Sequence, residues 1–212
     1  MFLYTGTKAG CKKQIIIQEK ISMKNVLLLG DSIRIGYDEF VQEALKDTAK
    51  VYYSDDNGRC TQYTLVSLME IAALTGEPQK IDLIHWNNGH WDIAHYGKNA
   101  PSLNSKEQYA FMLEMVANRL HELFSNAKIV FATTTPMNPN GSPAVNPRTT
   151  EEIMLYNETA KQVMKKLQIP VNDLFSVMKD KSAAFYKDYC HYTQEGFRIL
   201  GKQVADTIRN FL

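Results

Sequence analysis

The chain has 212 residues, of which 44% are hydrophobic and 22% charged, a composition typical of one globular domain and not of a disordered protein. Its 24 basic and 23 acidic side chains leave a formal net charge of +1, so no long-range field favours a nucleic-acid partner. No stretch approaches the roughly 20 apolar residues that span a bilayer, so no membrane partner is expected either.

Residues 1–22 lack the apolar run and the small-residue cleavage site of a signal peptide, and a buried-strand pattern begins only after Met23. We therefore interpret residues 1–22 as an N-terminal appendage and residues 23–212 as the domain. The three cysteines are odd in number, widely spaced and without a C-x-x-C pair, which fits a reducing compartment. A cytoplasmic location is expected.

Apolar runs and helical stripes alternate along the domain. Continuous apolar runs predict strands at residues 26–29, 50–53, 81–86, 128–132 and 169–171. Apolar residues at three- and four-residue spacing predict helices at about 33–45, 65–73, 105–124, 150–166 and 193–210. Residues 91–105 and the proline-rich stretch 136–147 are expected to be loops. This order predicts an α/β fold with a parallel sheet between two layers of helices.

Polar residues follow the predicted strands at the edge where parallel sheets bind ligands, the carboxyl ends of the strands. They are Gly30-Asp31-Ser32, Asn57-Gly58, Asn87-Asn88-Gly89-His90, Thr133-Thr134-Thr135 and, before the last helix, Asp188-Tyr189-Cys190-His191. These segments hold the candidate site residues.

Ser32, His191 and Asp188 are the candidate catalytic residues. Ser32 stands where a strand turns into a helix, so its amide lies at the positive end of that helix. A serine hydroxyl needs a base within hydrogen-bond reach, and His191 is the best candidate for that base. Asp188 stands three residues before His191, so its carboxylate can orient the imidazole. Taken alone, Gly-Asp-Ser is better explained as a simple turn with Asp31 or Ser32 capping a helix.

Gly58 and Asn88 suit an oxyanion hole together with the amide of Ser32. Gly58 has no side chain, so its amide can approach a substrate closely, and Asn88 can donate from its side-chain amide. Each of the two, considered separately, is more often an ordinary turn residue.

In combination these segments resemble the sequence blocks of the SGNH (GDSL-type) hydrolases over about residues 24–212. Residues 27–32 are similar to the first block, whose serine is the nucleophile, and residues 57–59 to the second, which holds an oxyanion glycine. Residues 87–92 take the place of the third block, and residues 188–191 match the D-x-x-H of the last. The resemblance implies a flavodoxin-like three-layer fold with a mostly parallel five-stranded sheet, and an acyl-ester hydrolase.

The third block departs from the family pattern. That pattern is usually G-x-N-D, whereas residues 89–92 read G-H-W-D, with Trp91 in place of the asparagine. Asn88, Asn87 or His90 could complete the oxyanion hole, or the hole could have only two donors. We favour Asn88.

Further candidates could contact the substrate. The cationic side chains of Arg34, Arg59 and Arg148 could hold an acidic or sugar-like group of the substrate. Surface ion pairs explain these arginines equally well. Cys190 is interpreted as a packing residue. The predicted substrate-binding residues are Arg34, Arg59, Asn87, His90 and Trp91.

The predicted function is a serine esterase that cleaves a small-molecule acyl ester, with acetyl groups on carbohydrates as the favoured substrates. The histidines show no metal-ligand spacing and no nucleotide-binding glycine motif occurs, so neither a metal nor a cofactor is expected. Two alternatives stay open. One is an acyltransferase on the same machinery, and the other is a non-catalytic binding module, which the altered third block favours.

Overall fold

The computed structural model describes residues 23–141 and 145–212, so the predicted appendage lies outside the described residues. Its sheet confirms the predicted parallel arrangement. Five parallel strands lie in the order β2-β1-β3-β4-β5. The strands are β1 (Lys24–Leu29), β2 (Ala49–Tyr52), β3 (Leu83–Asn87), β4 (Lys128–Ala132) and β5 (Val171–Asn172).

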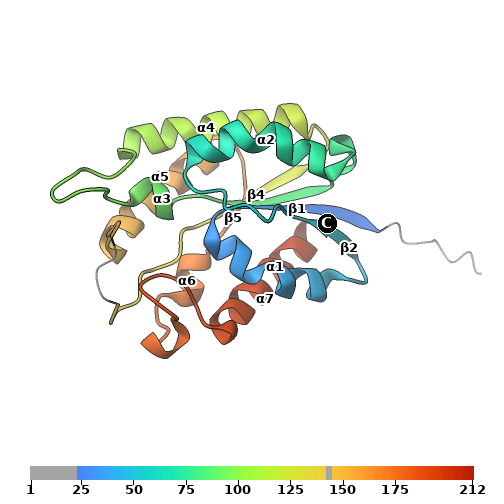
Figure 1. Ribbon diagram of the computed structural model, residues 1–212. Helices are drawn as coiled ribbons and strands as arrows, with labels where there is room; N and C mark the ends of the chain where they lie inside the picture. Colours follow the sequence, from blue (N-terminus) through green and yellow to red (C-terminus); the bar gives the residue numbers. More distant parts are fainter. Residues whose placement is uncertain (1–22, 142–144) are drawn as a thin grey trace, which may run out of the picture.

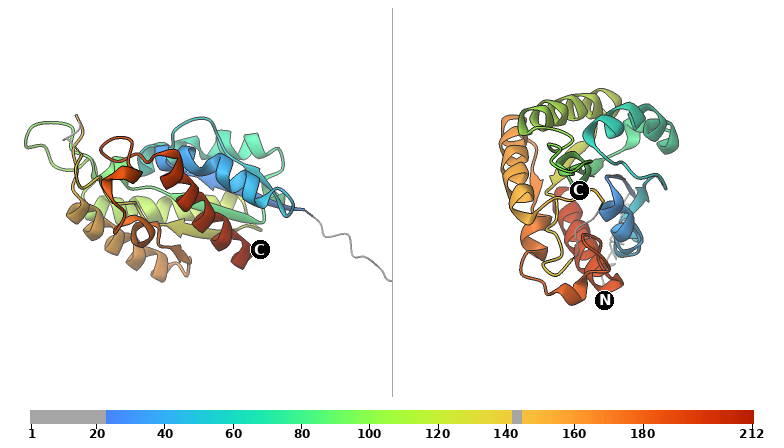
Figure 2. Two further views of the ribbon diagram at one scale, coloured as in Figure 1. Left: turned by 90° about the horizontal axis from the view of Figure 1, so that it is seen from below. Right: turned by 60° about the vertical axis from the view of Figure 1, so that its left-hand side comes forward.

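Helices cover both faces of the sheet and complete the predicted three layers (Figure 1). On one face lie α1 (Ser32–Leu45), α6 (Leu174–Met178) and α7 (Gln194–Phe211), and α1 and α7 run side by side (Figure 2). On the other face lie α2 (Thr61–Thr75), α4 (Lys106–Leu123) and α5 (Thr150–Lys166). Within the described ranges, no helix is long and apolar enough to cross a membrane.

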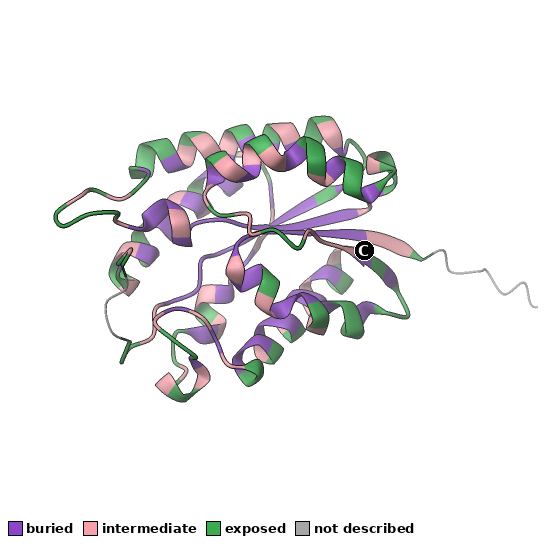
Figure 3. Ribbon diagram, in the orientation of Figure 1, coloured by how far each residue is buried: buried purple, intermediate pink, exposed green. Residues whose placement is uncertain are grey.

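The strands read as continuous apolar runs because both faces of the sheet are covered (Figure 3). Successive side chains of a strand point to opposite faces. Leu27 and Ile84 therefore belong to the core under α2, α4 and α5, whereas Val26 and Leu83 belong to the core under α1 and α7. All four side chains are fully buried.

The structure adds short helices that the sequence pattern did not predict. The segment expected to be a loop at 91–105 begins with α3 (His90–Ile93), and α6 precedes the last loop. Two 3-10 turns, η1 (Pro78–Lys80) and η2 (Ala183–Phe185), are also present. Elements of one turn are too short to show a helical period, so tertiary contacts decide them.

Candidate active site

Ser32 is the first residue of α1 and follows β1 through a tight turn. Gly30 has a φ of +155°, and a Cβ at this position would lie 2.0 Å from Oδ1 of Asn87. Asp31 is the N-cap of α1, and its carboxylate accepts hydrogen bonds from the amide of Ile33 at 3.0 Å and from the side chain of Asn87 at 3.1 Å. The turn therefore fixes Ser32 at the carboxyl edge of the sheet.

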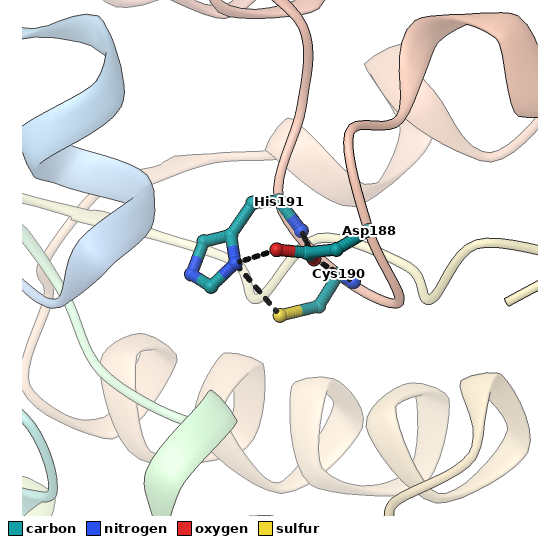
Figure 4. A group of neighbouring side chains, drawn as sticks. All are labelled: Asp188, Cys190 and His191. Atoms are coloured by element: carbon teal, nitrogen blue, oxygen red, sulfur yellow. Dashed lines mark hydrogen bonds and ion pairs between the residues drawn. The ribbon is translucent and has the colours of Figure 1, made fainter. Parts of the chain in front are cut away.

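The loop before α7 brings His191 to Ser32. Nε2 of His191 lies 2.7 Å from Oγ of Ser32. Nδ1 of His191 lies 2.8 Å from Oδ2 of Asp188 (Figure 4). The other oxygen of Asp188 accepts the amides of Cys190 at 2.9 Å and of His191 at 2.8 Å. Residues far apart in the sequence thus form one continuous hydrogen-bonded chain.

The hydrogen bonds to Asp188 keep its carboxylate charged. Partial burial raises the pKa of this carboxyl, but the amides of Cys190 and His191 and the imidazole outweigh burial and leave the pKa below its ordinary value. An ionised Asp188 can hold the proton on Nδ1 of His191 and stabilise an imidazolium.

Cys190 lies beside the same histidine but is not an activated thiol. Its Sγ lies 3.7 Å from Nδ1 of His191 and 3.5 Å from Nη2 of Arg148. The side chain is buried, and burial raises the pKa of the thiol to about 12. The thiol is therefore protonated at neutral pH, and Ser32 is the hydroxyl placed next to a base.

Asp188, Cys190 and His191 also offer ligand atoms that lie within 4.8 Å of one another (Figure 4). Two of these groups, however, already form a hydrogen bond with each other. The positive guanidinium of Arg148 contacts the sulfur and opposes a cation at this place. The cluster suits the serine–histidine–aspartate arrangement better than a metal ion.

In the structure, the predicted oxyanion donors Gly58 and Asn88 are engaged in internal hydrogen bonds. The amide of Gly58 donates to the carbonyl of Gly30 at 2.9 Å. Asn88 is fully buried, and its side chain donates to the carbonyl of Arg59 at 2.9 Å and accepts from Nε1 of Trp86 at 2.6 Å. These two hydrogen bonds hold the loop that follows β2, residues 53–60, against the turn after β1 and the end of β3.

Two other amides in these loops have no acceptor among the described residues. They belong to Ser32, at the N-terminus of α1, and to Cys60, the N-cap of α2. Helix N-termini carry a partial positive charge that favours a developing oxyanion. Sequence reasoning missed Cys60, because the apolar stripe predicts this helix from about residue 65, whereas α2 begins at Thr61.

Comparisons with known proteins point to one fold, although no protein-family model matches the sequence. The lipase/acylhydrolase from Enterococcus faecalis superposes with a TM-score of 0.71 at 20% identity, over 89% of this chain and 96% of that one. The acetyl xylan esterase AlAXEase gives 0.69 at 15% identity, over 87% and 99%. A GDSL-like lipase from Bacteroides thetaiotaomicron gives 0.66 at 16% identity, over 89% of each chain. The chain has the SGNH (GDSL-type) hydrolase fold.

A curated relative carries a related name. The GDSL esterase/lipase WDL1 of Oryza sativa subsp. japonica is 25% identical to this chain over 113 residues. Those residues make up 49% of this chain and 44% of WDL1, so the match spans less than half of that protein.

Within the SGNH fold, Arg34, which was predicted as a binding residue, is held by internal contacts. Its side chain is only 2% exposed and forms an ion pair with Asp38 at 2.5 Å. It also donates to the carbonyls of Ser54 and Asp56, each at 2.7 Å. Arg34 therefore connects α1 with the loop that follows β2.

Asn87 and His90, which were also predicted as binding residues, are buried. Asn87 is held by Asp31, as described above. Nε2 of His90 lies 3.1 Å from Oγ1 of Thr135, and its Nδ1 accepts from Nε of Arg148 at 3.0 Å. Both ring nitrogens of His90 are therefore engaged by side chains of the protein.

Trp91 and Arg59 are the predicted binding residues that keep exposed surface. Arg59 has a φ of +48°, and its guanidinium lies 4.2 Å from the ring centroid of Tyr63. The other three predicted binding residues are buried, although Arg34 lines a hollow of about 260 Å³ together with Gly58 and Tyr63.

Proposed function

We propose that this protein is a serine esterase that cleaves a small acyl ester, with Ser32 as nucleophile, His191 as general acid and base, and Asp188 as the group that orients His191. The observation that carries the proposal is the hydrogen-bonded chain from Oγ of Ser32 through His191 to Asp188, with links of 2.7 Å and 2.8 Å. The names of the fold neighbours, a lipase/acylhydrolase and an acetyl xylan esterase, support it.

The reaction follows from this geometry. Nε2 of His191 takes the proton of Ser32 as Oγ attacks the ester carbonyl, and His191 then gives that proton to the leaving alcohol. Water activated by His191 next attacks the acyl group on Ser32 and releases the acid. Asp188 keeps the proton on Nδ1 throughout. The amides of Ser32 and Cys60 are the donors available to the oxyanion.

The proposed substrates are short acyl esters, and acetyl groups on carbohydrates are the favoured class. A neighbour in fold is an acetyl xylan esterase. The partly exposed Trp91 offers an aromatic surface of the kind on which a sugar ring can stack.

The first test is reaction of the purified protein with a fluorophosphonate probe. Wild type is expected to be labelled, whereas Ser32→Ala and His191→Ala are not, because one lacks the nucleophile and the other its base. Cys60→Ser is the matched control, since it removes a thiol but keeps the backbone amide. Undiminished labelling or esterase activity in Ser32→Ala would contradict the proposal.

One observation favours a second candidate function, a non-catalytic binding module. The amide of Gly58 and the side chain of Asn88 are both engaged in internal hydrogen bonds, which leaves fewer donors for an oxyanion. A module of this kind would leave wild type unlabelled by the probe. It would still show a rise in melting temperature with acetylated sugars.

A further inference from the structure

Arg148 is a buried cation whose hydrogen-bond partners carry no charge. The residue is only 8% exposed. It donates to Nδ1 of His90 at 3.0 Å, to the carbonyl of Asn146 at 3.1 Å and to Sγ of Cys190 at 3.5 Å. Its guanidinium also lies 5.6 Å from the ring centroid of Tyr189. In the described part of the chain, no carboxylate forms an ion pair with it.

The acidic groups nearby are committed to other partners. Asp188 holds His191. Asp31 caps α1 through one oxygen, and its charge interacts with Arg148 at longer range without forming an ion pair, while its other oxygen has no hydrogen-bond partner among the described residues. A buried charge without a close counter-charge is costly, so a site that retains one is suited to an anion that arrives from outside. The partners of Arg148 described here do not supply that anion.

Arg148 keeps donors for such a group. Each terminal nitrogen of a guanidinium carries two N–H groups. In Arg148 each of these nitrogens makes one hydrogen bond, to Asn146 and to Cys190 respectively, which leaves one N–H on each. Donors on the two terminal nitrogens of one guanidinium can bind the two oxygens of a carboxylate.

An open hollow of about 580 Å³ lies beside Arg148 and next to the catalytic loop. Tyr189 lines this hollow, and its ring centroid is 6.1 Å from that of His191. Lys179 also lines it, is exposed and makes no ion pair within the described ranges. Glu151, in the first turn of α5, also lines the hollow and is exposed, and its negative charge opposes the binding of an anion there.

We propose that Arg148, with Lys179, forms an anion subsite that selects esters whose alcohol part carries a carboxylate, such as an acetylated sugar acid. This inference rests on the proposed esterase function. In such a substrate the ester carbonyl lies at Ser32 while the carboxylate lies in the hollow beyond Tyr189. Arg148 is then a specificity-determining residue that contacts the substrate away from the reacting atoms.

The test compares two esters that differ only in the carboxylate: acetylated methyl glucuronoside and acetylated methyl glucoside. Wild type is expected to show a kcat/KM about 10- to 100-fold higher for the acid, the range that charged hydrogen bonds provide. Arg148→Gln should bring the ratio of the two values close to one, and Lys179→Gln should lower it. Lys165→Gln, at the far end of α5, is the matched control and should keep the preference.

Binding to Ser32→Ala separates failure of the subsite from failure of the esterase. The dissociation constants of both esters are measured with Ser32→Ala, alone and combined with Arg148→Gln, and Arg148→Lys replaces the glutamine variant if that one does not fold. Tighter binding of the acid that disappears with Arg148→Gln supports the subsite even if no ester is hydrolysed. Equal binding of the two esters to Ser32→Ala, or a preference that survives Arg148→Gln, overturns it. Hydrolysis that persists in Ser32→Ala counts against the esterase proposal alone.

Discussion

At the scale of single residues, the site depends on how Asp188 is held. Its side chain is 40% exposed, and water would otherwise compete for the carboxylate. Two backbone amides of its own loop fix one oxygen, so the other is left to point at Nδ1 of His191. The tautomer of His191 that can accept the proton of Ser32 follows from this one contact.

Asp188→Asn is therefore expected to lower kcat on a short acyl ester by on the order of 10³ or more, because a carboxamide can favour the wrong tautomer of His191. Steady-state kinetics with 4-nitrophenyl acetate measure the loss. Asp180→Asn, at an exposed aspartate outside the hydrogen-bonded chain, is the control. A loss of less than tenfold in Asp188→Asn would contradict this role.

At the scale of elements, the loop that follows β2 is held by hydrogen bonds to α1 and to the turn between β1 and α1. Arg34 in α1 binds the carbonyls of Ser54 and Asp56, and the backbone of Gly58 packs on that of Gly30. The turn that positions Ser32 and the loop that leads to Cys60 therefore form one unit. A change in one should move the other.

Gly58→Ala tests this coupling. A Cβ at residue 58 would lie 2.5 Å from the carbonyl oxygen of Gly30, so the loop must shift. We expect a loss of about 1–3 kcal/mol in the free energy of unfolding, as for other overpacked sites, together with slower labelling of Ser32 by a fluorophosphonate. Gly97→Ala, where the nearest atom is a side-chain carbon at 3.4 Å, should change neither. Urea denaturation and labelling rates provide the measurements, and unchanged labelling in Gly58→Ala would argue against the coupling.

At the scale of the whole molecule, one buried carboxyl joins three helices on the same face of the sheet. Asp92 in α3 accepts hydrogen bonds from the amide and hydroxyl of Thr61, which begins α2, and from Asn104, which precedes α4. Its second oxygen has no partner among the described residues. Burial raises the pKa of Asp92 from 3.8 to about 6 although these hydrogen bonds oppose the change.

This shift makes the stability of the protein depend on pH. The folded state holds the proton of Asp92 more tightly than the unfolded chain does. The stabilisation that comes from protonated Asp92 is therefore fully present below about pH 4 and is lost as the pH rises through about 6. The change amounts to about 3 kcal/mol at most. Asp92→Asn keeps the shape without the charge, so its free energy of unfolding should fall less between pH 4 and pH 7 than that of wild type. Urea titrations at both pH values measure the difference, with exposed Asp47→Asn as control, and an unchanged pH dependence in Asp92→Asn would refute the assignment.

Much of the fold was predictable from the sequence because its signals are local. The apolar runs at 26–29 and 128–132 mark strands buried on both faces, and the stripes between them mark helices. The alternation of the two implies a parallel sheet, and a parallel sheet gathers the ends of its strands at one edge. Ser32 could therefore be placed at that edge from the sequence, whereas Asp188 and His191, which stand before the last helix, were proposed as its partners from their three-residue spacing and the resemblance to the last SGNH block.

The tertiary structure alone decided which polar groups are free and which are engaged. Gly58, Asn88 and Arg34 carry suitable donors, but the fold provides each with an internal acceptor. Arg148 was one of several arginines in the sequence, and only the folded chain buries it beside Cys190, where no carboxylate of the described residues forms an ion pair with it. Whether two residues distant in the sequence form a hydrogen bond depends on differences of a few tenths of an ångström in the distance between donor and acceptor. Composition and periodicity do not encode such distances, because they report only which face of an element is buried.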